Sequence, residues 1–112
     1  MTDEFSPCMF HDHKDGKFSI TFSEFDDFIE FIEERGGQGG GYSWESMVKA
    51  VLMLRQIDLP EVDFDPEGDM FCAISSDRHS LTKIAAIIKE LSADRLLMES
   101  AIKHATENEY FE

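Results

Sequence analysis

Alternating hydrophobic and polar residues predict a β-hairpin near the start of the chain. Phe18, Ile20 and Phe22 alternate with polar residues, and Asp15-Gly16 predicts a two-residue turn within a hairpin that spans residues 7–23. Because successive side chains of a strand point to opposite faces, one face of this hairpin should be buried.

A second hairpin is predicted from about Val62 to Ser75. Val62 and Phe64 alternate with acidic residues, residues 66–69 suit a turn, and residues 70–74 form an apolar run. Such a run is typical of a strand that is buried on both faces, so we expect it at the centre of the sheet.

Hydrophobic residues at helical spacing follow the first hairpin and predict two helices. The first should begin at a cap on Ser23 and end at Gly36, and the second should begin at a cap on Ser43 and end before Pro60. The glycine-rich residues 36–41 between them predict a mobile loop.

Two more helices are predicted after the second hairpin. Ser76 or Asp77 should cap a helix with an apolar side up to Leu91, a fourth helix should follow Ser92, and the acidic tail from Glu107 should be frayed.

The order hairpin, helix, helix therefore occurs twice, and a shift of 53 residues places Phe18 on Phe71, which suggests an ancient duplication. Separate hairpins and helix pairs do not form a parallel, doubly wound sheet. We expect the α+β class: one domain, residues 1–112, with a four-stranded, mainly antiparallel sheet and about four helices packed on one face.

Charge narrows the class of partner. The 112 residues include 24 Asp and Glu against 10 Lys and Arg, for a net charge of -14. This charge repels nucleic-acid phosphates and anionic lipids and favours a basic partner, although it is equally compatible with solubility alone. Cys8 and Cys72 lie in apolar stretches as expected for reduced, buried thiols, and no signal peptide or membrane span is recognisable, so we expect a cytoplasmic protein.

The sequence contains no catalytic signature. His11 and His13 share one side of a predicted strand, but surface histidines are commoner there than metal ligands, which would need a third partner. Neither cysteine has basic neighbours that would lower its pKa, and the glycine-rich segment lacks the Gly-Lys-Ser/Thr ending of a phosphate-binding loop. We expect no enzymatic activity, no cofactor and no bound metal.

Tyr42 and Trp44 lie where the glycine-rich segment enters a helix, a place at which binding surfaces use rigid aromatic side chains. The alternative is that Trp44 packs the helix start against the core, and the sequence supports both interpretations equally. Binding is slightly favoured for Tyr42, which precedes the expected cap.

Two segments resemble the bacterial family called immunity protein 51. Gly39-Gly40-Gly41-Tyr42-Ser43-Trp44-Glu45 is similar to the family pattern Gly-Asn-Gly-Tyr-x-Trp-Glu, with Gly40 in place of Asn. Phe64-Asp65-Pro66-Glu67-Gly68-Asp69-Met70-Phe71 is similar to its Phe-Asp-Pro-Glu segment, with a looser turn after Glu67. The resemblance covers about residues 36–91.

This resemblance implies a cytoplasmic immunity protein that neutralises the toxin of a polymorphic toxin system by occlusion. Aromatic side chains would then be anchors, and acids would pair with lysine or arginine of the toxin. The residues expected to contact the partner are Tyr42, Trp44, Glu45, Asp65 and Glu67.

Two other functions stay open at this point. One is a regulatory or adaptor module that binds proteins through the glycine-rich segment and a surface that includes Tyr42 and Trp44. The other is a small metal-dependent enzyme that uses His11, His13 and nearby carboxylates.

Overall fold

The computed structural model describes residues 4–112, and its elements follow the expected order of hairpin and helix pair, twice. The strands are β1 (Met9–Asp12), β2 (Phe18–Phe22), β3 (Val62–Phe64) and β4 (Phe71–Ser75). The helices are α1 (Ile29–Glu33), α2 (Gly41–Leu54), α3 (Arg78–Ala93) and α4 (Arg95–Glu107). The predicted α+β class is confirmed.

The sheet is antiparallel, with the strand order β1-β2-β4-β3. β4 lies in the interior of the sheet, as its apolar sequence predicts. Ile20 pairs with Ala73 at the middle of the β2–β4 ladder, and these two residues are separated by the same 53 positions that relate the two halves of the sequence. The hairpins are therefore related by an approximate two-fold axis through the centre of the sheet.

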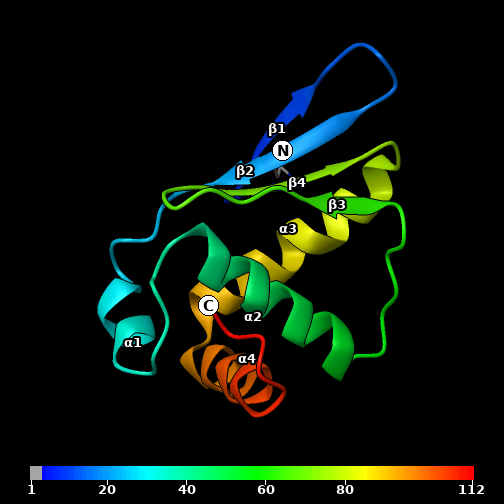
Figure 1. Cartoon of the computed structure of the whole chain (residues 1–112). Coiled ribbons are helices and arrows are strands. Elements are labelled where there is room, and N and C mark those ends of the chain that lie inside the picture. Colours follow the sequence, from blue (N-terminus) through cyan, green and yellow to red (C-terminus); the bar gives the residue numbers. More distant parts are fainter. Residues whose placement is uncertain (1–3) are drawn as a thin grey trace.

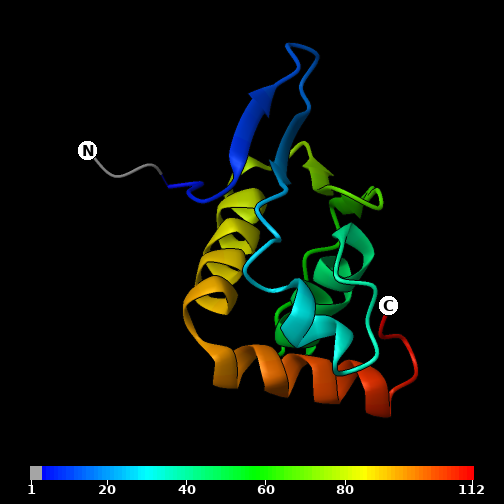
Figure 2. The ribbon, with the colours of Figure 1, turned by 90° about the vertical axis from the view of Figure 1, so that its left-hand side faces the viewer.

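All four helices lie on one side of the sheet, and the other side carries no helix (Figure 1). α2 and α3 pack directly against β4, while α4 packs against α2 and α3 as an outer helical layer (Figure 2). The core lies between the sheet and these helices, where Ile20, Phe71 and Ile84 are fully buried. Between residues 4 and 112, no helix is both long and apolar enough to cross a bilayer.

The first helix begins later than the sequence predicts. Ser23 does not cap it, because Phe25 and Phe28 turn into the core and the regular helix starts only at Ile29. Its end is confirmed: the N–H of Gly36 donates to the carbonyl oxygen of Glu33, and Gly36 has a φ of 95°. This left-handed glycine is the usual end of a helix.

The second helix differs at both ends. It begins at Gly41 with Gly40 as the N-cap, so Ser43 lies inside the helix and is not its cap. It stops at Leu54, several residues before Pro60, and Leu54 itself is half exposed. Gln56, with a φ of 57°, follows the end of the helix.

The first turn and the tail also differ from expectation. Five residues, 13–17, join β1 to β2, and the N–H of His13 donates to the carbonyl oxygen of Lys17 at 3.1 Å. The tail is not frayed, because Tyr110 and Phe111 pack against the core. The backbone N–H of Glu112 also donates to Ser46 Oγ at 3.2 Å. Burial of two aromatic rings outweighs the acidic composition of the tail.

Candidate functional site

The glycine-rich segment and the β3–β4 turn pack backbone against backbone. A Cβ atom on Gly40 would lie 1.9 Å from the carbonyl oxygen of Gly68, and one on Gly41 would lie 2.1 Å from that of Met70 and 2.2 Å from that of Glu67. The N–H of Gly41 donates to the Gly68 carbonyl oxygen at 3.4 Å. Glycine is needed here because no side chain fits between the two backbones.

This contact joins the two segments that resemble the immunity protein pattern, and it fixes the end of the segment for which the sequence predicts a mobile loop. The turn itself is closed by the Glu67 N–H, which donates to the carbonyl oxygen of Met70 at 2.8 Å. Ser43, buried in the first turn of α2, accepts the N–H of Gly39 at 3.0 Å and donates to the backbone of Glu112.

The roles of Gly40, Gly41 and Ser43 were missed in the sequence. The available signal was a pair of glycines directly before a tyrosine–tryptophan helix start, at positions where a capping Ser or Asp would otherwise be favoured. Capping preferences depend only on residues that are close in the sequence. They therefore point to Ser43 and take no account of the β3–β4 turn that packs against Gly40 and Gly41.

Trp44 lies at the centre of the core. Its side chain is 0% exposed, and its ring centre lies 4.8 Å from that of Phe22, 6.0 Å from Phe25 and 5.4 Å from Phe28. The indole Nε1 has no hydrogen-bond partner among residues 4–112. The expected role of Trp44 as a surface anchor is therefore corrected: its ring packs the start of α2 against β2 and the segment before α1.

The other two candidates on α2 reach the surface. Tyr42 is 37% exposed and directly follows Gly41, so it lies beside the contact with the β3–β4 turn. Glu45 is half-buried, and its carboxylate pairs with Lys49 Nζ at 3.1 Å. The Lys49 ammonium also lies 5.3 Å from the ring centre of Phe64, which links α2 to β3.

Asp65 and Glu67 are exposed on the β3–β4 side of the same contact. Burial raises the pKa of the nearby Cys72 thiol, and the negative charges of Asp65 and Glu67 raise this pKa further. The structure thus brings Tyr42, Glu45 and the two acids of the turn to neighbouring positions, while Trp44 lies beneath them.

Cys72 should therefore be a slowly reacting thiol. In a Cys8→Ala background, we expect native Cys72 to react with a disulfide reagent at pH 8 at least about tenfold more slowly than the urea-unfolded chain. The thiol is buried, which limits access of the reagent, and its raised pKa also depletes the thiolate. Asp65→Asn with Glu67→Gln should increase the native rate. Equal rates in the native and unfolded chains, followed by absorbance of the released thiol, would contradict this prediction.

The two histidines of the first hairpin already have hydrogen-bond partners. His11 Nε2 lies 3.2 Å from Thr21 Oγ1, and His13 Nε2 lies 2.8 Å from Ser19 Oγ. In the part of the chain that the structure describes, no three His, Cys, Asp or Glu side chains gather in a group that could hold a metal ion.

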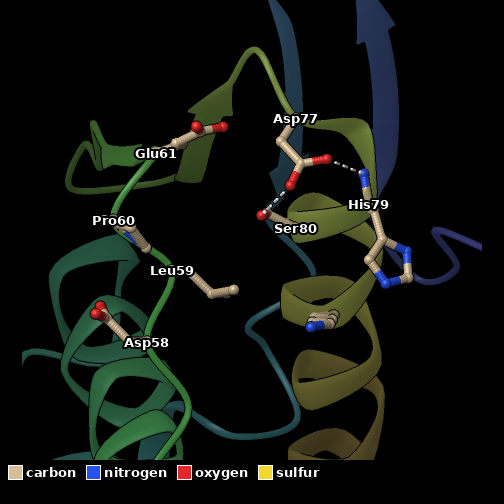
Figure 3. A pocket seen from close by; sticks show the side chains of 8 residues that line it. Asp58, Leu59, Pro60, Glu61, Asp77, His79 and Ser80 are labelled. Atoms are coloured by element: carbon tan, nitrogen blue, oxygen red, sulfur yellow. Dashed lines mark hydrogen bonds between the residues drawn. The ribbon is translucent and has the colours of Figure 1, made fainter.

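A surface hollow lies between the α2–β3 connection and the first turn of α3 (Figure 3). Of the two caps that the sequence allows for α3, Asp77 is the one that forms: its carboxylate accepts the backbone N–H of His79 at 3.1 Å and the hydroxyl of Ser80 at 2.8 Å. These bonds, the one from Ser80 first, lower the pKa of Asp77. Figure 3 shows both bonds directed at the helix start, so this carboxylate is engaged in capping.

Comparison with models of protein families gives a match. A family model described as immunity protein 51 matches residues 8–107, which includes all of the strands and helices described above. Searches of curated proteins and of solved structures gave no match.

Proposed function

The chain belongs to the immunity protein 51 family, and we propose that it binds a cognate bacterial toxin domain and neutralises it by covering the toxin's active site or another essential surface. The family match over residues 8–107 carries this proposal. The action is stoichiometric binding in the cytoplasm of the producing cell, and it requires neither catalysis nor a cofactor.

Charge supports a basic partner. A net charge of -14 attracts a basic protein surface and accelerates encounter with it, and the same charge disfavours nucleic acid and anionic membranes. Tyr42, Glu45, Asp65 and Glu67 are the proposed contact residues, with Tyr42 as the aromatic anchor. Trp44 supports this surface from beneath and makes no contact of its own.

Co-expression tests the proposal. The toxin domain encoded immediately beside the gene for this chain should arrest bacterial growth when expressed alone, and co-expression of the chain should restore growth. An unrelated toxin of the same chemistry serves as the control and should not be neutralised. The purified pair should also elute as a complex in gel filtration. Equal growth arrest with and without the folded chain would refute the proposed function.

A further inference from the structure

The helix-free face of the sheet is built from two rows of side chains that the strand registers define. In the first row, His11 pairs with Ser19, Ser19 with Ile74, and Ile74 with Asp63. Residues that face each other across paired strands lie on the same face of the sheet, so this row crosses all four strands.

The second row consists of the residues that lie two positions from the first row on each strand. Met9 pairs with Thr21, Thr21 pairs with Cys72, and the N–H of Asp65 donates to the carbonyl oxygen of Cys72 at 3.0 Å. The effect of the Asp65 charge on the Cys72 thiol agrees with this placement. The residues between the rows, including Ile20 and Ala73, point to the helical side and are buried there.

The face has two different edges. In the centre, Ser19 and Cys72 are buried and Thr21 and Ile74 are partly buried. The hydroxyls of Ser19 and Thr21 are hydrogen-bonded to the side chains of His13 and His11. At the β1 edge, Met9 is 67% exposed. The β3 edge is acidic, because every second residue from 61 to 69 is Asp or Glu.

The acids of the β3 edge are not compensated by cations. Asp63, Asp65 and Glu67 are exposed, and none of the ion pairs between residues 4 and 112 involves them. Around α1, Arg35 pairs with Glu34 at 3.8 Å, whereas Glu30 and Glu33 take part in no ion pair between residues 4 and 112. The β3 edge thus presents exposed carboxylates without an ion partner in the described chain, and these carboxylates suit a cationic partner.

We propose that the helix-free face is the surface on which the toxin docks, and that its β3 edge receives a lysine- or arginine-rich patch of the toxin. This inference rests on the proposed function and extends the contact from Asp65 and Glu67 to Asp63, Met9 and the face between them. Tyr42 and Glu45 belong to α2 on the other side of the sheet, so they contact the toxin only at the margin of this surface, beside the β3–β4 turn. The central hydroxyls already have hydrogen-bond partners, so covering the centre leaves none of them unpaired, and the exposed carboxylates form a charged rim along the β3 edge. Charge complementarity then fixes the orientation of the partner.

The role of the charged edge is tested with two charge-reversal variants that change the net charge equally, one on the proposed face and one on the helical side. Asp63→Lys/Asp65→Lys/Glu67→Lys changes three exposed acids of the face, and Glu30→Lys/Glu33→Lys/Glu107→Lys changes three exposed acids on the helical side by the same net charge. Affinity for the purified toxin domain encoded beside the gene is measured by surface plasmon resonance at 50 and 150 mM salt. We expect at least about 100-fold weaker binding for the first variant and about threefold or less for the second.

The apolar edge is tested separately with Met9→Asp, and Leu96→Asp on α4 is its control because Leu96 is 76% exposed on the helical side. Only the Met9 variant should weaken binding, by about tenfold. Unfolding midpoints followed by Trp44 fluorescence verify that each variant is folded. If the lysine variant does not fold, Asp63→Asn/Asp65→Asn/Glu67→Gln replaces it, with an expected loss of at least about tenfold.

The outcomes separate the two proposals. If the wild-type chain binds and neutralises the toxin but both charge-reversal variants behave alike, or Met9→Asp binds as the wild type does, the docking face is refuted and the immunity function stands. If the wild-type chain neither binds nor neutralises the toxin, the function and the docking face fail together.

Discussion

Gly41→Ala is expected to lower the free energy of unfolding by about 3 kcal/mol, the upper end of the usual cost of overpacking. Alanine alone would favour the first turn of α2 by about 1 kcal/mol over glycine. This gain is outweighed because the new Cβ would lie 2.1 and 2.2 Å from two carbonyl oxygens of the β3–β4 turn. These are backbone atoms, so no rotation of a side chain relieves the contact.

Gly68→Ala is the matched control for this prediction. Gly68 lies in the same turn, but a Cβ there meets nothing within 4 Å, and its φ is not in the left-handed region. We expect no loss of stability and a gain of up to about 0.5 kcal/mol from the stiffer unfolded chain. Urea unfolding followed by Trp44 fluorescence gives both values. Equal midpoints for the two variants would show that the turn moves freely away from α2.

Local signals in the sequence were sufficient for the two hairpins and for the interior position of β4, but not for the strand order or for the length of the first turn. The run at β4 predicts a central strand because consecutive residues are apolar, so that both faces of the strand are apolar. Asp77 predicts a cap because its hydrogen-bond partners are only two and three residues away. The starts of α1 and α2 were mispredicted at Ser23 and Ser43 for the opposite reason. The rings of Phe25 and Phe28 pack against Trp44, and Gly41 packs against the β3–β4 turn. These contacts with residues distant in the sequence override the local capping preference.

The candidate site was predictable in part. The resemblance of two segments to a family pattern correctly indicated the family, and the fold adds that these segments touch. The pattern does not distinguish a residue that shapes this contact from one that meets a partner, which is why both Trp44 and Tyr42 were expected to contact the partner, although binding was favoured slightly only for Tyr42. Burial separates them, since Trp44 is enclosed by phenylalanine rings while Tyr42 reaches solvent.

Trp44→Ala is expected to cost about 4 kcal/mol of stability, in the range for large-to-small changes in a core. The indole contacts three phenylalanine rings from two segments, so its removal leaves a cavity between α2, β2 and the chain before α1. Trp44→Phe should cost less, about 1–2 kcal/mol, because it keeps an aromatic ring and removes an indole N–H that has no hydrogen-bond partner in the described chain. Urea unfolding followed by far-ultraviolet circular dichroism measures both, since the indole is lost.

The same variant distinguishes a core residue from a binding anchor. If Trp44 only supports the surface, Trp44→Phe should protect cells less at elevated temperature, while the folded variant at low temperature binds the toxin domain within about threefold of the wild-type affinity. Tyr42→Ala should show the reverse, with an unfolding midpoint close to that of the wild type and weaker binding, because Tyr42 is partly exposed beside the turn. A Trp44→Phe variant of unchanged stability and strongly reduced affinity would return Trp44 to the binding surface and require α2 to open when the partner binds.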